Sequence, residues 1–235
     1  LGQVDVAAIT QAAAAGQPIE VPYTLDAMAD DTVSLMEALG HESAHVCGAS
    51  MGGMIAQTCA IRHSEKVRTL TSIMSTTGSP AVPPARPEAM AAILTPPPAD
   101  REGAIDHAVK VWRVIGSPGF EFDEDDVRAT AALAIDRGIH PPGVARQYGA
   151  ILGHGNRRPA LEKIDTLTLV IHGKEDALVP WEGGRDTCDA VPGSSMMTIQ
   201  GMGHDLPREA WPQIQTAIVQ LAAQVEGTIG KAEEE

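Results

Sequence analysis

Apolar residues recur along the chain at helical and strand spacings and predict alternating helices and strands. Residues 23–39 have a helical pattern, with Thr24 as a candidate N-terminal cap. Next, the pattern predicts a buried strand over 43–49, a helix over 51–63 and a strand over 67–74. This alternation is typical of a parallel, doubly wound α/β sheet. The positions expected to face the core on the first helix are Leu25, Met28, Ala29, Thr32, Leu35, Met36 and Leu39.

A change in composition after these elements predicts an insertion. Residues 76–99 are rich in proline, which cannot sit inside a sheet and would stiffen an excursion away from it. Amphipathic helices follow, with Asp100 and Asp123 as candidate caps, and a third helix is expected over about 142–152. We therefore expect residues 79–160 to form a helical lid or cap over a cleft.

The two segments that flank this insertion, residues 1–78 and 161–235, are predicted to form the α/β core. In the second of them, apolar runs predict strands over 166–171 and 195–199. A final amphipathic helix begins near Trp211.

A strand, a sharp turn and a helix start meet in the sequence Gly48-Ala-Ser50-Met-Gly52. It matches the G-x-S-x-G nucleophile elbow, in which small residues let strand and helix approach while the serine is held in a strained, exposed conformation. Gly48 and Gly52 are therefore expected to serve close packing, and Ser50 to be the nucleophile.

A serine hydroxyl needs a base to remove its proton, and the base needs a third group to orient it. The chain offers Asp176, with Glu175 as a competing acid, in the loop after one predicted strand, and the spacing from Gly173 favours Asp176. His204 lies in a glycine-rich loop after the next strand. The carboxyl ends of parallel strands meet at one edge of a sheet, so Ser50, Asp176 and His204 are expected to converge there.

Three motifs together resemble the α/β-hydrolase superfamily, in its lidded carboxylesterase/lipase branch. They are Gly48-Ala-Ser-Met-Gly-Gly-Met-Ile, Val170-Ile-His-Gly-Lys-Glu-Asp176 and Gly201-Met-Gly-His204. The insertion, with Val111-Trp-Arg-Val-Ile-Gly-Ser-Pro-Gly, is similar to bacterial esterases of the polyketide methylesterase type.

The resemblance implies a serine hydrolase that cleaves a carboxylic ester of a small or apolar substrate through an acyl-enzyme. Ser50 would attack, His204 would act as base and Asp176 would orient it, with the backbone N–H of Met51 in the oxyanion hole. No cofactor or metal is expected. Met54, Met202 and Trp112 are candidates for an acyl pocket, although apolar residues at such spacings also suit a plain core.

The same triad serves other reactions, because function resides in the site and not in the fold. Thioester hydrolysis, carbon–carbon bond hydrolysis and cofactor-free perhydrolysis stay open as alternatives. A ligand-binding relative that turns over negligibly is a further alternative from a different class of protein.

Charge and cysteine content narrow the range of partners. The net charge of −14 and the pI near 4.9 argue against a nucleic-acid or anionic-membrane partner. The three cysteines have no metal-ligand spacing, so we expect neither a disulfide framework nor a zinc site, and Cys47 is expected to be a small core residue. No apolar run reaches the roughly 20 residues of a membrane span. We expect a small-molecule substrate and, by default, a cytoplasmic location.

Members of the α/β-hydrolase superfamily, which this sequence resembles, begin with about four strands and a His-Gly type loop that supplies the second oxyanion N–H. Residues 1–22 show neither, and their prolines and lack of periodicity predict a surface connection. The strand that leads to Ser50 is thus expected to lack a neighbour on one side, and the second oxyanion donor is unassigned. We expect the working protein to be longer than this sequence, or a second chain to complete the sheet.

Overall fold

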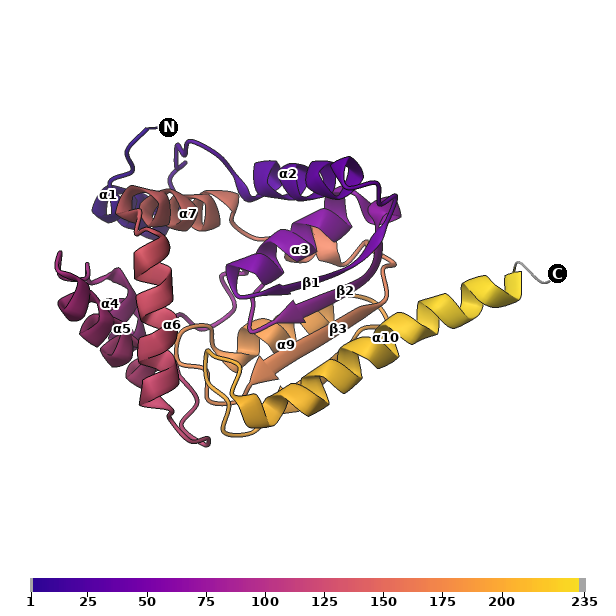
Figure 1. Ribbon diagram of the computed structural model, residues 1–235. Coiled ribbons are helices and arrows are strands. Elements are labelled where there is room, and N and C mark those ends of the chain that lie inside the picture. Colours follow the sequence, from indigo (N-terminus) through magenta and orange to yellow (C-terminus); the bar gives the residue numbers. More distant parts are fainter. Residues whose placement is uncertain (1, 233–235) are drawn as a thin grey trace.

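A parallel four-stranded sheet forms the centre of the computed structural model, which describes residues 2–232 and their side chains through residue 227 (Figure 1). The strands are β1 (Ala44–Ala49), β2 (Val67–Ile73), β3 (Thr168–Gly173) and β4 (Ser195–Ile199). They lie in the order β1-β2-β3-β4, and every neighbouring pair is parallel. The predicted α/β class and all four predicted strands are confirmed, with ends within two residues of those expected.

Helices cover both faces of this sheet. One apolar cluster joins α2 (Leu25–Ala38) and α3 (Met51–Arg62) to β2 and to the end of α9 (Trp181–Ala190). A second cluster joins α10 (Trp211–Ala232) to β2, β3 and β4. Two short 3₁₀ turns lie at Ser64–Lys66 (η1) and Arg208–Ala210 (η2).

The chain between β2 and β3 is helical. Its helices are α4 (Pro87–Leu94), α5 (Arg101–Ile115), α6 (Glu124–Arg137), α7 (Pro141–His154) and α8 (Arg158–Leu161). The predicted caps of α5 and α6 are confirmed, because the Asp100 and Asp123 carboxylates each accept an N–H of the first turn. In Figure 1, α4, α5 and α6 gather beyond one end of the sheet. The boundaries of the insertion, 79–160, stay a prediction.

The N-terminal segment, predicted as a surface connection without a helix, contains one. It forms α1 (Val6–Ala14), whose first turn is capped by Asp5, and α1 lies beside α7 (Figure 1). The run is rich in alanine, the strongest helix former, so a helix forms without a clear amphipathic pattern, and Pro18 and Pro22 follow its end. Helices α4, α8 and α9 were also not predicted. In α4, Pro87 occupies a first-turn position, where proline costs no hydrogen bond.

The buried face of α2 differs from the predicted one. Thr24 caps the helix as expected, and Leu25, Ala29 and Val33 are its buried residues. Leu35 and Leu39 are instead 62% and 68% exposed. The buried residues of α2 form a single row at i, i+4 spacing, and Ala29 and Val33 of this row belong to the cluster with α3. The predicted apolar face was wider than this row.

β1 is the edge strand of the described sheet, as expected, because the described residues before it form no strand. Cys47 on this strand is exposed, so its assignment to the core was wrong. Its neighbour Val46 packs against the cluster of α2 and α3, and successive side chains of a strand point to opposite faces, so Cys47 lies on the face away from that cluster. The idea that a further segment or a second chain completes this edge stays a prediction.

The close approach at the turn after β1 depends on Gly48 and Gly53. A Cβ at Gly48 would lie 2.0 Å from the Gly52 carbonyl oxygen, and one at Gly53 would lie 2.6 Å from the Ser75 Cβ. A Cβ at Gly52 would meet nothing within 4 Å. The steric role predicted for Gly48 is confirmed, and the one predicted for Gly52 belongs to Gly53.

This difference predicts opposite effects for two matched substitutions. Gly48→Ala should lower the free energy of unfolding by about 1–3 kcal/mol or more, because the strand and helix backbones must separate. Gly52→Ala should leave it unchanged or raise it by up to about 1 kcal/mol, because alanine favours a helix more than glycine does. Urea denaturation of both variants measures the difference. Equal losses of stability would contradict the assignment.

Candidate active site

Ser50 lies at the apex of the turn between β1 and α3. Its backbone angles are φ 56° and ψ −120°, a region that non-glycine residues rarely occupy and that costs on the order of 1–3 kcal/mol. The Ser50 N–H donates to the Ile73 carbonyl at 2.9 Å, and its own carbonyl accepts the N–H groups of Gly53 and Met54. These hydrogen bonds fix the strained residue to β2 and to α3.

Asp176 lies in the loop after β3, and its side chain is fully buried. One carboxylate oxygen accepts the N–H groups of Leu178 at 2.9 Å and Val179 at 2.8 Å. The other accepts the Nδ1–H of His204 at 2.7 Å. Glu175, the competing acid, points elsewhere and accepts the Gly201 N–H at 2.5 Å. The structure therefore brings Asp176, and not Glu175, against the histidine.

His204 joins the acid to the serine. Because the ionised Asp176 can only accept, the ring proton resides on Nδ1, and Nε2 is left as an acceptor. The Ser50 hydroxyl donates to this Nε2 at 2.9 Å. The three predicted side chains thus form one continuous hydrogen-bond chain, although they are 154 and 28 residues apart in sequence. Such a chain can move a proton from a hydroxyl to an imidazole.

The surroundings of Asp176 favour its ionised form. Burial by itself raises the pKa of this carboxyl. The contacts of the carboxylate with His172 and His204 and the hydrogen bond from the Val179 N–H outweigh burial, so the pKa lies below its ordinary value. At neutral pH the carboxylate is therefore available to fix the His204 tautomer.

His172, near the end of β3, is a buried neighbour of Asp176. Its ring is 0% exposed, and its Nε2–H donates to the Val179 carbonyl at 2.8 Å. The same nitrogen lies 3.6 Å from the Asp176 carboxylate. A Cβ at Gly184 would lie 2.3 Å from the other ring nitrogen, so this glycine makes room for the ring. His172 therefore supports the loop that carries Asp176.

The Met51 N–H is available as an oxyanion donor. Met51 is the first residue of α3, where backbone N–H groups have no partner within the helix, and among residues 2–232 no acceptor is found for it. The start of a helix also favours negative charge. Its part in an oxyanion hole stays a prediction, as does the second donor.

The three residues expected in an acyl pocket lie in different surroundings. Met202 is 0% exposed in the core beneath α10, and Met54 is 5% exposed in a cluster with Leu25 and Ala150. Neither offers surface to a substrate in this structure. Trp112 is 37% exposed and lines two surface cavities of about 310 and 420 Å³.

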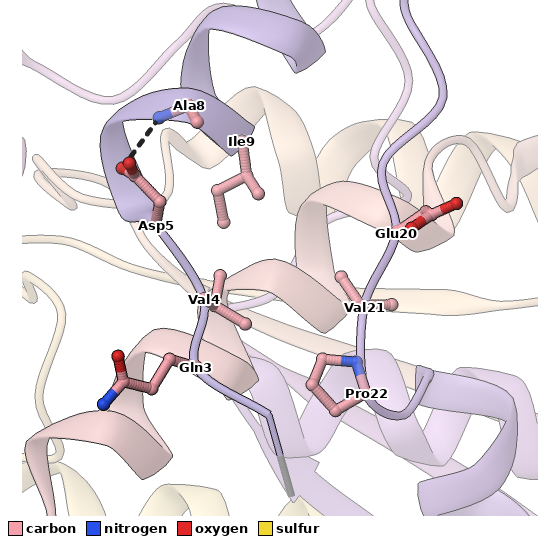
Figure 2. A pocket seen from close by; sticks show the side chains of 8 residues that line it. All are labelled: Gln3, Val4, Asp5, Ala8, Ile9, Glu20, Val21 and Pro22. Carbon is pink, nitrogen blue, oxygen red and sulfur yellow. Dashed lines mark hydrogen bonds between the residues drawn. The ribbon is translucent and has the colours of Figure 1, made fainter.

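A further cavity of about 330 Å³ lies beside the N-terminal helix and contains none of the three triad residues (Figure 2). Its lining residues are Gln3, Val4, Asp5, Ala8, Ile9, Glu20, Val21 and Pro22. Figure 2 shows the Asp5 carboxylate occupied by the Ala8 N–H. The Glu20 side chain is exposed, and the lining holds no serine, cysteine or histidine, so we assign this cavity no chemistry.

The part of the chain that the structure describes has neither a cluster of metal ligands nor a membrane-spanning helix. No three His, Cys, Asp or Glu side chains in this part of the chain gather closely enough to hold a metal ion. Among the helices described, none has the length and apolar character needed to cross a bilayer.

A family model described as the alpha/beta hydrolase fold matches residues 11–209, so the chain belongs to this family. It is similar to rhodomycin D methylesterase DauP from Streptomyces sp. (strain C5), with 28% identity over 224 residues covering 84% of this chain and 72% of that protein. It is also similar to 2-hydroxymuconate semialdehyde hydrolase from Pseudomonas sp. (strain CF600), with 27% identity over 210 residues covering 86% of this chain and 67% of that protein. The family is hydrolytic, and these relatives are an esterase and a hydrolase.

The fold is shared with solved structures. A thermophilic esterase from Thermogutta terrifontis has a TM-score of 0.66 and 24% identity, covering 89% of this chain and 75% of its own. The meta-cleavage product hydrolase of Pseudomonas fluorescens IP01 has a TM-score of 0.62 and 23% identity, covering 89% of this chain and 73% of its own. The predicted α/β-hydrolase fold is thus confirmed.

The lowered pKa of Asp176 predicts how Asp176→Asn changes stability with pH. The ionised carboxylate should contribute about 1.5–3 kcal/mol through its hydrogen bonds. A depressed folded-state pKa keeps this contribution complete above the unfolded value of about 3.9, and it is lost as the pH falls through the folded value. Urea denaturation should show a constant difference between wild type and variant from pH 8 to 5 that shrinks only below about pH 4. A difference that shrinks already between pH 7 and 5 would contradict a lowered pKa.

Proposed function

We propose that this protein hydrolyses a carboxylic ester through an acyl-enzyme, with Ser50 as nucleophile, His204 as general base and Asp176 as the group that orients it. The observation that supports this most strongly is the continuous hydrogen-bond chain between these three side chains in a member of a hydrolytic family. The similarity to a rhodomycin D methylesterase makes a methyl ester the first substrate type to test.

The reaction proceeds in two halves. The Ser50 Oγ attacks the ester carbonyl carbon as its proton moves to the His204 Nε2, and the resulting oxyanion accepts the Met51 N–H. When the tetrahedral intermediate collapses, the carbon–oxygen bond to the alcohol breaks and His204 gives its proton to the leaving oxygen. Water then attacks the acyl-serine with His204 again as base, which releases the acid and restores the Ser50 hydroxyl.

Substitution of the nucleophile tests this proposal. Ser50→Ala should lower kcat for a p-nitrophenyl ester by about 10⁴-fold or more, because triad members act as a unit. The variant should unfold at the same temperature as the wild type. Turnover by the variant near the wild-type rate would contradict the assignment of Ser50. A wild type that binds the ester but turns over at most once would favour a ligand-binding relative instead.

Carbon–carbon bond hydrolysis is the second candidate, because the chain is also similar to 2-hydroxymuconate semialdehyde hydrolase over most of its length. The two reactions differ in the leaving group, which is an alcohol oxygen in one and a carbon in the other. We expect kcat/KM to be highest on an ester when the rates on an ester, a thioester and a β-diketone are compared. A preference for the β-diketone would favour the second candidate, and a preference for the thioester would favour a thioesterase.

A further inference from the structure

The segment that joins α5 to α6 touches the histidine loop. Residues 115–119, Ile-Gly-Ser-Pro-Gly, belong to the insertion. They end the motif that is similar to esterases of the polyketide methylesterase type. None of them takes part in the mechanism proposed above. They lie against residues 201–205, the loop that carries His204. We call the contact between these two segments the clasp.

Ser117 is the side chain at the centre of the clasp. Its hydroxyl oxygen accepts the Gly203 N–H at 2.9 Å, and its hydroxyl proton is donated to the Asp205 carboxylate. A serine hydroxyl can donate and accept at once, so one side chain binds both residues that flank His204. Gly203 is buried, so its N–H would have no alternative partner in water if the hydroxyl were removed.

Backbone hydrogen bonds reinforce this contact. The His204 N–H donates to the Ile115 carbonyl at 2.7 Å. The Gly119 N–H donates to the Gly201 carbonyl at 2.9 Å. The insertion therefore holds the main chain of the histidine loop from both ends, and one of these bonds is made by the proposed base itself.

The two segments approach so closely that glycine is required on both sides. A Cβ at Gly203 would lie 2.2 Å from the Gly116 carbonyl oxygen, and one at Gly119 would lie 2.4 Å from the Gly201 Cα. Gly201 also has a φ of +77°, which glycine adopts without strain. Backbone contact of this kind leaves little freedom for one segment to shift without the other.

The His204 ring and its main chain thus depend on different parts of the protein. The ring is bound by Ser50 and Asp176, which belong to the α/β core, whereas the His204 N–H is bound by the insertion. A displacement of about 1 Å in a catalytic group can cost 10²-fold in rate. A shift of the insertion would therefore move the imidazole away from the Ser50 hydroxyl.

We propose that Ser117 is a positioning residue for His204, and that the clasp couples the insertion to the catalytic base. This inference rests on the proposed function. It predicts that Ser117 acts on the chemical step through the placement of the imidazole, without contact to the substrate.

The test compares Ser117→Ala with Ser117→Thr and with a matched control. Ser117→Ala should lower kcat for a p-nitrophenyl ester by about 10- to 100-fold with KM within about twofold, as expected for a loss confined to the transition state. Ser117→Thr keeps the hydroxyl and should restore most of the rate, since the residue before a proline favours an extended backbone that threonine adopts readily. Ser194→Ala is the matched control, because it removes a hydroxyl that is bonded to the Cys188 carbonyl. Ser194 lies just before β4, at the opposite end of this strand from the His204 loop, so kcat should be unchanged.

A second measurement needs no substrate. Hydrogen exchange of a peptide covering residues 201–206 should be about tenfold faster in Ser117→Ala than in the wild type, because the clasp opens more often. The same peptide in Ser194→Ala should exchange at the wild-type rate.

The outcomes separate the two proposals. If the wild type shows Ser50-dependent turnover and Ser117→Ala matches it in kcat, the clasp inference is wrong and the proposed function stands. The inference is also wrong if Ser117→Ala loses activity only in proportion to a lower melting temperature and threonine restores nothing. If the wild type has no Ser50-dependent turnover, the proposed function fails and the inference fails with it.

Discussion

The parallel direction of the four strands is the constraint on which the site depends. Parallel strands end at the same edge of a sheet, and the loops after β1, β3 and β4 carry Ser50, Asp176 and His204 in turn. Each side chain needs only a short loop to reach its partner, because the strands already bring the loop ends together. Two hydrogen bonds of 2.9 and 2.7 Å then join residues that are far apart in the sequence.

Close backbone contact holds these loops in place. A Cβ at Gly173, the last residue of β3, would lie 2.2 Å from the Met202 carbonyl oxygen, so the acid and histidine loops meet without an intervening side chain. Gly48 has the same role at the serine, and Gly203 has it against the insertion. The candidate site is thus built from backbones in contact, which restricts Ser50, Asp176 and His204 more than flexible side chains could.

Local signals in the sequence predicted the parts of the fold that depend on near neighbours. The caps at Thr24, Asp100 and Asp123 and the four strands all follow from short motifs with a known physical basis. The choice of Asp176 over Glu175 also agrees with the observed contacts, because spacing from the strand end determines which side chain faces the next loop.

Features that depend on distant segments could not be predicted in this way. The exposure of Leu35 depends on how α2 packs against α3, and the role of Gly53 depends on Ser75 in the neighbouring strand's loop. Ser117 lies 86 residues before Gly203, and nothing in either segment indicates their contact. Helix α1 was missed for a different reason, since alanine content rather than periodicity decides it.

Intact mass spectrometry with a fluorophosphonate probe shows whether His204 activates the Ser50 hydroxyl, because the probe bonds only to an activated serine. We predict a single covalent adduct that maps to Ser50 and that is absent from both Ser50→Ala and His204→Ala. If the folded wild-type protein forms no adduct, Ser50 is not an activated nucleophile. If His204→Ala forms the adduct at the wild-type rate, His204 does not activate Ser50.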